Sequence, residues 1–328
     1  MAKKVVVLGT GGTIAGTAAS PTDNIGYTAA QVGVEQLLAA IPGLDEVLGG
    51  RGLQSERVAQ LDSKDMSFEV WQRLRDRVVY HLARSDVMGV VITHGTDTLE
   101  ETAFFLHRTL SVGELQGKPV VLTCAMRPAS ALAPDGPQNL RDAVAVACTL
   151  GARGVVAVCA GVVHAGLDVQ KIYSYRVDAF DSGDSGPLGY LEEGCVRLVR
   201  NWPVAHVQSA RAAINWRAED LVWPSVEIVM NYAGASGALV DVLVAGNLTL
   251  QAGAKPLKGL VVAATGNGTL HHALEAALVR AQGAGVTVVV ASRCARGRVL
   301  PTPASLFTDS KGLSAVKARV ALMLDLMH

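Results

Sequence analysis

The sequence lacks the features that mark membrane, secreted and nucleic-acid-binding proteins. Lysine plus arginine and aspartate plus glutamate number 29 each, so the overall charge gives no electrostatic reason to expect a nucleic acid or an anionic membrane as partner. The apolar run near the amino terminus, residues 5–8, is too short for a signal peptide or a membrane span. We therefore expect a cytoplasmic protein whose partner is a small molecule.

Cysteine and aromatic residues are also few. The cysteines are odd in number, widely spaced and without a C-x-x-C pair, which predicts reduced core thiols rather than a disulfide framework; they are Cys124, Cys148, Cys159, Cys195 and Cys294. Only five phenylalanines accompany 34 glycines. This composition predicts an interior of valine, leucine and alanine with many tight turns, as in α/β proteins.

Strand-like and helical stretches alternate along the chain. The first group of strands is expected at residues 4–8, 87–93, 120–122 and 155–158, and its helices at 32–40, 68–83, 98–110 and 138–150. After a further strand-like stretch at 194–201, strands at 226–230, 259–264 and 286–291 alternate with helices at 237–245, 270–282 and 315–327. The fold class is therefore α/β: a large, doubly wound, mainly parallel sheet domain at 1–201, a linker at 202–222 and a smaller α/β domain at 223–328.

One polar turn follows the expected strand at 87–93. It contains His94, Gly95, Thr96 and Asp97, and Thr98 with Glu101 has the form of a capping box that would start a helix. Open parallel sheets place their chemistry at this end of their strands. A hydroxyl, an imidazole and a carboxylate beside a glycine are suited to acyl transfer, although a capped surface turn without chemistry explains the same residues.

A glycine-rich loop follows the first strand, at residues 9–16. A dinucleotide fingerprint would need a glycine where Ile14 stands, and residues 17–27 form turns rather than the required helix. This segment is instead a surface loop that could close over a site. The glycines could bring backbone N–H groups near Thr13 to stabilise an oxyanion.

A threonine hydroxyl needs a base or a polarising partner to act as a nucleophile. The candidates are Tyr27, His94, Asp97 and Lys171. Lys171 lies in an otherwise apolar stretch, where burial would lower its pKa and allow it to act as a base. The alternatives are a solvated lysine and a hydrogen-bonded turn histidine, and nothing near His94 has metal-ligand spacing.

Several motifs, in order along nearly the whole chain, resemble the bacterial-type L-asparaginases and glutaminase-asparaginases. They lie at residues 10–16, 62–66, 93–98, 125–128, 135–139, 168–171, 186–189 and 266–268, together with Tyr27. The resemblance implies hydrolysis of a side-chain amide to a carboxylate and ammonia through an acyl-threonine, without cofactor or metal. It also implies a homotetramer or homodimer.

The same resemblance assigns roles to residues. Thr13 would be the nucleophile on a mobile lid, and Tyr27 would polarise it. Thr96, Asp97 and Lys171 would form a second group, in which the lysine activates the threonine and the aspartate contacts the substrate ammonium. The expected substrate-binding residues are Gly12, Ser63, Lys64, Gly95, Thr96 and Asp97, with Ser63 holding the α-carboxylate.

The chain departs from the family around the expected amino-group pocket. Lys64 stands where glutamine is frequent, and Thr269 where asparagine is common. The loop at 294–304 contains no acidic residue where the family's neighbouring subunit would supply a glutamate. These changes predict weak affinity for free L-asparagine.

Three other functions fit parts of the sequence. The chain could release ammonia for a partner amidotransferase, although such chains tend to carry an additional amino-terminal domain. It could bind small amides with little turnover, which Lys64 allows. A dinucleotide enzyme is the remaining alternative, and Ile14 argues against it.

Overall fold

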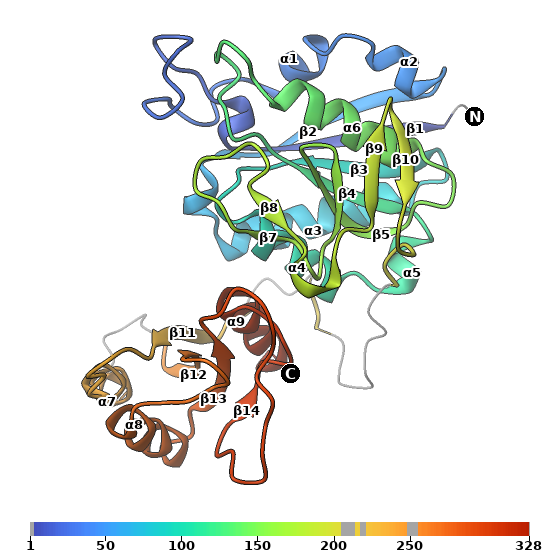
Figure 1. Cartoon of the computed structure of the whole chain (residues 1–328). Helices are drawn as coiled ribbons and strands as arrows, with labels where there is room; N and C mark the ends of the chain where they lie inside the picture. The colour runs from blue at the N-terminus through green and yellow to red at the C-terminus, as the bar shows by residue number, and fades with distance from the viewer. Residues whose placement is uncertain (1–2, 205–213, 217–220, 248–254, 328) are drawn as a thin grey trace. The chain divides into compact units, whose positions relative to one another are not determined.

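The computed structural model describes residues 3–204, 214–216, 221–247 and 255–327 (Figure 1). The chain divides into two compact units, Met1–Ser209 and Ala210–His328. Each unit is built on a sheet with helices on both faces, which confirms the predicted two-domain α/β class. Most of the predicted linker, at residues 205–213 and 217–220, lies outside the described residues.

The large unit contains an eight-stranded sheet in the order β10-β9-β6-β5-β4-β3-β1-β2. Its parallel part comprises β1 (Lys4–Gly11), β2 (Gly52–Leu61), β3 (Val87–Thr93), β4 (Pro119–Thr123) and β5 (Gly154–Cys159). Its antiparallel part comprises β6 (Val162–Ala165), β9 (Gly189–Glu192) and β10 (Cys195–Leu198). The central strands are valine-rich runs that are buried at nearly every residue, as expected where helices cover both faces of a sheet.

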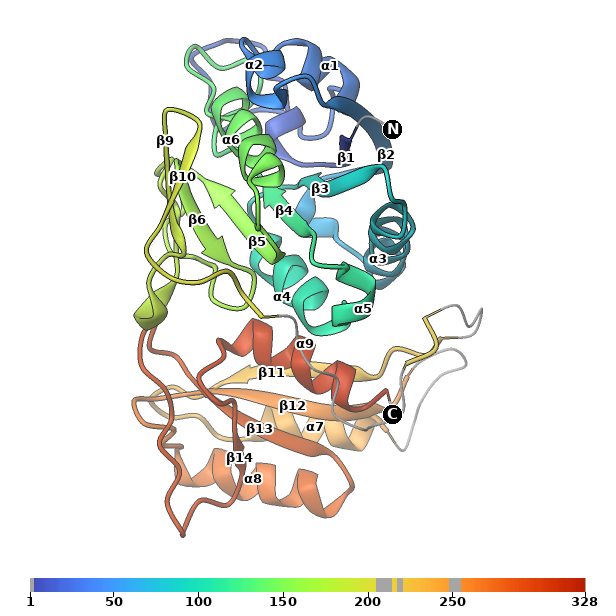
Figure 2. The ribbon, with the colours of Figure 1, turned by 90° about the vertical axis from the view of Figure 1, so that its right-hand side faces the viewer.

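Helices cover the two faces of this sheet (Figure 2). On one face lie α1 (Val34–Ala39), α2 (Leu44–Leu48) and α6 (Gly136–Cys148), which share a hydrophobic cluster with Val5, Val91 and Val121 of the strands. The other face carries α3 (Phe68–Leu82), α4 (Leu99–Thr109) and the short α5 (Val112–Leu115). The predicted helix at 32–40 is shorter in the structure, since α1 begins at Val34 after Gly33 and ends at Ala39.

Strand β2 was not predicted, because it does not look like a buried strand. It is at the edge of the sheet and carries Gln54, Glu56, Arg57 and Gln60, and only Val58 of its ten residues is buried. A second omission is the two-stranded ribbon of β7 (Gln170–Lys171) and β8 (Phe180–Asp181). Both omissions matter for the site, because β2 leads into Ser63 and β7 contains Lys171.

The small unit has a parallel sheet in the order β11-β12-β13-β14, formed by Ser225–Met230, Leu257–Ala264, Thr287–Ser292 and Thr308–Asp309. Helices α7 (Ala238–Gly246) and α8 (His272–Gly283) pack on one face, and α9 (Ala315–Asp325) packs on the other. All three predicted strands and all three predicted helices of this region are present within a few residues.

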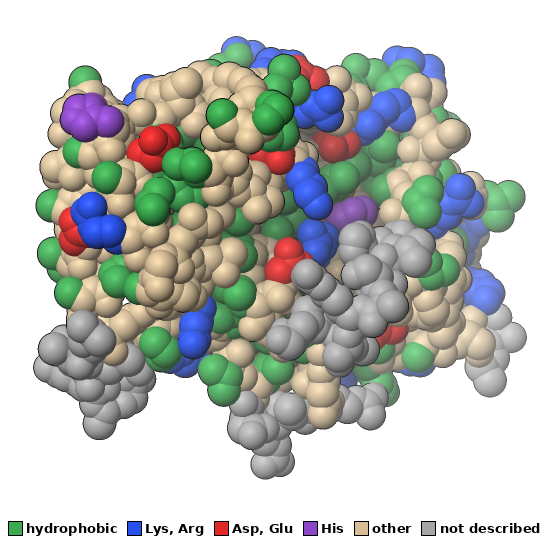
Figure 3. All heavy atoms as spheres, turned by 90° about the horizontal axis from the view of Figure 1, so that it is seen from below, with side chains coloured by type: hydrophobic (Ala, Val, Ile, Leu, Met, Phe, Trp, Pro, Cys, Tyr) green, Lys and Arg blue, Asp and Glu red, His purple; other side chains and the backbone are tan. Residues whose placement is uncertain are grey.

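The surface and the thiols agree with the composition. Figure 3 shows one face of the molecule, on which Lys and Arg side chains lie among Asp and Glu side chains. All five cysteines are free thiols, as predicted, but the predicted core position is wrong for Cys195 and Cys294, which are exposed. In the described part of the chain, no helix combines the length and apolar character needed to cross a bilayer, and no group of three or more His, Cys, Asp or Glu side chains is placed to hold a metal ion.

Candidate active site

Three neighbouring strands, β3, β1 and β2, end at one edge of the large sheet and bring three loops together. Parallel pairing is the reason, because Gly9 pairs with Thr93 and Gly11 with Leu61, so the carboxyl ends coincide. The Thr10 hydroxyl donates to the Thr93 carbonyl at 2.8 Å and joins two of the strand ends. The candidate threonines and the predicted binding residues of the 62–66 motif therefore belong to one site.

The three loops contact one another at two glycine residues, Gly12 and Gly95. A Cβ atom on Gly12 would lie 2.4 Å from the Gly95 Cα, and a Cβ atom on Gly95 would lie 2.4 Å from the Ser63 Oγ. Gly12 also has a φ of 83°, which favours glycine. These two glycines therefore allow the Thr13 loop, the Thr96 loop and Ser63 to pack without a side chain between them.

The glycines of the Thr13 loop were expected to offer N–H groups to an oxyanion, but the N–H of Gly12 already donates to the Leu61 carbonyl at 2.9 Å. Among the hydrogen bonds of residues 3–204, none uses the N–H of Thr96. That group, in the turn between β3 and α4, is available to a developing oxyanion.

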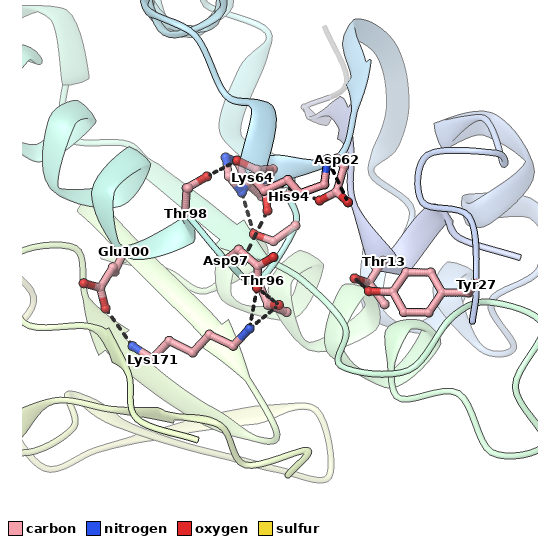
Figure 4. Close-up of polar contacts among 12 residues, drawn as sticks. Thr13, Tyr27, Asp62, Lys64, His94, Thr96, Asp97, Thr98, Glu100 and Lys171 are labelled. Atoms are coloured by element: carbon pink, nitrogen blue, oxygen red, sulfur yellow. Dashed lines mark hydrogen bonds and ion pairs between the residues drawn. The ribbon is translucent and has the colours of Figure 1, made fainter. Parts of the chain in front are cut away.

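Thr13 begins the 3-10 turn η1 (Thr13–Ala15) directly after β1. Its Oγ1 lies 2.6 Å from the hydroxyl oxygen of Tyr27. Tyr27 lies on the segment 17–28, which we call the lid and whose two ends form a bridge between Thr17 and Thr28. The structure thus brings the predicted pair together (Figure 4).

Thr96 belongs to a second group on the turn between β3 and α4. Lys171 Nζ lies 2.8 Å from Thr96 Oγ1 and 2.7 Å from Asp97 Oδ1, as Figure 4 shows. The Lys171 side chain is 19% exposed. As an ammonium, Nζ donates to both oxygens; as a neutral amine, it is placed to accept the Thr96 hydroxyl proton.

Both hydroxyl-bearing residues are buried, although turns at strand ends usually lie at the surface. Thr13 is 6% exposed and Thr96 is 5% exposed. Packing of the three loops against one another, together with the lid over Thr13, accounts for their burial.

The predicted capping box at Thr98 is wrong. The Thr98 side chain makes no cap hydrogen bond to α4, and its hydroxyl donates to the Ser63 carbonyl at 2.8 Å. The Ser63 Oγ in turn accepts from the Asp97 N–H at 3.2 Å. These two bonds fix the end of β2 against the start of α4, so Thr98 joins two loops of the site.

His94 is a structural turn residue in the described structure. Its Nδ1 lies 2.7 Å from the Gly95 carbonyl and its Nε2 lies 2.9 Å from the Thr102 hydroxyl oxygen, which accepts from Trp71 Nε1 at 2.8 Å. The carbonyl requires a donor, so Nδ1 carries the proton and Nε2 accepts. Complete burial lowers the pKa of His94 to about 4, which keeps the imidazole neutral.

Lys64 follows Ser63 in the 3-10 turn η2 (Ser63–Asp65). Its side chain is 61% exposed, and its ammonium pairs with the Asp65 carboxylate at 2.5 Å and lies 3.9 Å from Asp62 Oδ2. The hydrogen bond that Lys64 donates to the Asp65 carboxylate raises the pKa of Lys64, and the negative charges of Asp62 and Asp97 make smaller contributions. Lys64 is therefore a cation near Asp97, and the carboxylates of Asp62 and Asp65 partly neutralise its charge.

Sequence reasoning did not identify Glu100 as part of the site. This residue in the first turn of α4 is 8% exposed, and its Oε2 accepts from the Lys171 N–H at 2.8 Å. The bond holds the ribbon strand β7 at the position from which Lys171 reaches Thr96. The only available signal was an acidic residue in a helix first turn, which is too common to suggest this role.

Comparison with known proteins gives the family. Residues 4–204 match the model of the asparaginase N-terminal domain, and residues 225–328 match the glutaminase/asparaginase C-terminal domain. The chain belongs to the asparaginase family. The predicted family is confirmed.

Individual asparaginases are similar over nearly the whole chain. The glutaminase-asparaginase of Pseudomonas fluorescens biotype A is 36% identical over 98% of this chain and 86% of its own length. The L-asparaginase 2 of Escherichia coli K12 is 37% identical over 98% of this chain and 88% of its own length. A crystal structure of a probable cytoplasmic L-asparaginase from Campylobacter jejuni superposes with a TM-score of 0.88 at 35% identity, covering 99% of this chain and 95% of that one. As an asparaginase-family member, the chain is an amidohydrolase, which confirms the predicted enzyme class.

Proposed function

We propose that the chain hydrolyses the side-chain amide of L-asparagine or a related amide through an acyl-threonine on Thr13. The observation that carries this proposal is the pairing of two activated hydroxyls on adjoining loops: Thr13 beside Tyr27, and Thr96 beside Lys171 and Asp97. Each threonine has the polarising partner that a weak nucleophile requires.

In the first step, Thr13 Oγ1 attacks the amide carbon and its proton passes to the Tyr27 hydroxyl, which at the same time gives its own proton to the amide nitrogen. The carbon–nitrogen bond then breaks, the nitrogen leaves as ammonia, and an ester of Thr13 remains. Water attacks this ester to release the carboxylate product and restore the hydroxyl. The Thr96 N–H stabilises the oxyanion in both steps.

The second group has a supporting role in this scheme. Lys171 takes the Thr96 hydroxyl proton and returns it, so the Thr96 oxygen polarises the attacking water or the substrate amide. Ser63 binds the substrate α-carboxylate, Asp97 contacts the ammonium, and Lys64 lies at the edge of the same pocket. Gly12 and Gly95 contribute close backbone packing.

Two other properties stay predictions of the proposed function. The chain is expected to form a homotetramer or a homodimer, which light scattering on the purified protein measures. A stable monomer with full activity would contradict this prediction. The cytoplasmic location likewise stays a prediction.

The test is ammonia release from a panel of amides, measured beside binding of the same panel. We expect turnover of at least one side-chain amide that stops in Thr13→Ala. Binding without release in every case would favour the alternative of a small-amide binding protein. Release only after addition of an amidotransferase partner would favour the ammonia-supplying alternative.

A further inference from the structure

The lid is attached to the large unit on two sides. On one side the residues that directly follow the lid join the Thr13 loop, where the Ala30 N–H donates to the Gly12 carbonyl at 3.1 Å and the Val32 N–H to the Ala15 carbonyl at 2.9 Å. On the other side it lies against the loop after β4, residues 126–135, which we call the brace loop. Figures 1 and 2 both show the two loops side by side.

Three hydrogen bonds join the lid and its entry to the brace loop, and only one of them uses a side chain. They are Ala129 N–H to the Gly16 carbonyl at 2.9 Å, Ala18 N–H to Ser130 Oγ at 2.7 Å and Leu132 N–H to the Pro21 carbonyl at 2.8 Å. The bond to Ser130 lies between the other two along the brace loop. A substitution at Ser130 can therefore weaken this attachment while both backbone bonds remain.

The brace loop is itself fixed. The Asp135 carboxylate accepts from the N–H groups of Met126 and Arg127, each at 2.9 Å. The Arg127 guanidinium donates to the Ala133 carbonyl at 3.0 Å. Because the loop is tied at both ends, it provides a firm surface for the lid.

The lid depends on such polar contacts more than on apolar packing. Its Ile25 side chain is 78% exposed, and the turn leading to Tyr27 is held by Asp23, whose Oδ1 accepts from the N–H groups of Ile25 and Gly26 at 2.9 Å and 2.7 Å. Segments with few buried apolar contacts open at low free energy, so one hydrogen bond shifts the opening equilibrium measurably. Opening of the lid at Ala18 therefore displaces the segment that places Tyr27 beside Thr13.

We propose that Ser130 is a positioning residue that holds the lid closed and so keeps Tyr27 against Thr13. It touches neither the substrate nor the reacting atoms, and it acts through the Ala18 N–H. The inference rests on the proposed function, because it gives the lid its role in the reaction of Thr13.

The experiment compares Ser130→Ala, Ser130→Thr and Ser305→Ala in the full chain. Ser305 is the matched control, because its Oγ also accepts from a backbone N–H, that of Thr302, at 2.9 Å, but in the small unit. Two quantities are measured: the rate of cleavage within residues 18–26 by a protease of low specificity, and kcat/KM for ammonia release from the best amide of the panel. The melting temperature of each variant reports global stability.

For Ser130→Ala we expect lid cleavage to accelerate about two- to tenfold and kcat/KM to fall by a similar factor, which is the range for loss of one hydrogen bond. Ser130→Thr should restore both values, and the melting temperature should match that of Ser305→Ala. Unchanged cleavage in Ser130→Ala, equal acceleration in Ser305→Ala, or faster cleavage with unchanged kcat/KM would each overturn the proposal. If wild type releases no ammonia from any amide, the proposed function fails, whereas the cleavage rates still decide whether Ser130 holds the lid.

Discussion

The two threonines are almost equally buried, but different parts of the molecule bury them. Thr13 is covered by a lid whose attachments are a few hydrogen bonds and the contact with Tyr27. Thr96 is fixed by the body of the large unit, through Lys171, Ser63 and the buried His94. The half of the site that contains Thr13 can therefore open for substrate by movement of the lid alone, while the half that contains Thr96 keeps its geometry, which is a common division between gating and positioning in enzymes.

Removal of either hydroxyl should have the largest effect. We expect Thr13→Ala and Thr96→Val each to lower kcat by about a thousandfold or more, because loss of one member of a cooperating set removes most of its contribution. Trapping of an acyl group, followed by mass spectrometry, should locate it on Thr13. Full activity in both variants would refute the assignment of the site.

Burial of both threonines adds a requirement to this test. Each variant leaves a buried space or an unpaired partner, so its melting temperature must be compared with wild type before the loss of rate is assigned to chemistry. We expect a small change in melting temperature, since each substitution removes few atoms.

Substitution of the partner groups sharpens the comparison between the two halves. Lys171→Met should lower kcat by about a hundredfold or more and leave substrate binding measurable, because the thioether keeps the length of the side chain but cannot exchange a proton. Normal activity of Lys171→Met at all pH values would make the lysine structural.

Tyr27→Phe should also lower kcat and, in addition, accelerate lid cleavage, because it removes the Thr13 contact from the lid.

The half of the site that contains Thr96 and His94 should show a characteristic pH dependence of stability. An unfolded histidine binds a proton below a pKa of about 6.5, whereas burial lowers the pKa of His94 to about 4. Between these values the unfolded chain binds more protons, so the free energy of unfolding falls as the pH falls, by about 3 kcal/mol at most for this residue.

Urea unfolding at several pH values measures this contribution. His94→Gln should flatten the dependence between pH 6.5 and 4, and the exposed His272→Gln is its control. An equally steep dependence in His94→Gln would show that other groups are responsible.

The smallest effect is expected at Lys64. The ion pairs with Asp65 and Asp62 reduce the repulsion that its charge would exert on a substrate ammonium near Asp97. We therefore expect Lys64→Gln to improve kcat/KM for L-asparagine by only about two- to tenfold, relative to amides without a free amino group. A wild type that already binds asparagine at micromolar levels, with no gain in the variant, would contradict this view of the pocket.

The sequence was sufficient for the longer helices and the central parallel strands because their patterns are strong, but not for the short helices α2 and α5. Runs such as residues 87–92 contain no polar side chain, so the local sequence is enough to predict their burial. The edge strand β2 was not predicted because its polar side chains are typical of a surface segment. The ribbon strand β7 was not predicted because two residues are too few to show an alternating pattern of polar and apolar side chains. Each is defined by pairing with another segment, β2 with β1 and β7 with β8.

The site shows the same limit. Thr13, Tyr27, Thr96, Asp97 and Lys171 were found because their motifs resemble a family, while Glu100 and Ser130 act through single hydrogen bonds across 71 and 112 residues of sequence. The misassigned capping box at Thr98 has a similar cause, since its hydroxyl had a nonlocal acceptor in Ser63. A local sequence pattern cannot show which distant residue will form such a hydrogen bond.

The contact between Gly12 and Gly95 also limits how this enzyme can be altered. Since neither position has room for a Cβ atom, the two threonine loops behave as a single joint, and a displacement of one must move the other. Exchange of the amino-terminal loop alone for that of a relative would leave a mismatch at this joint unless the turn after β3 were exchanged with it. Successful recombination of asparaginase sequences in this region should therefore transfer both turns together.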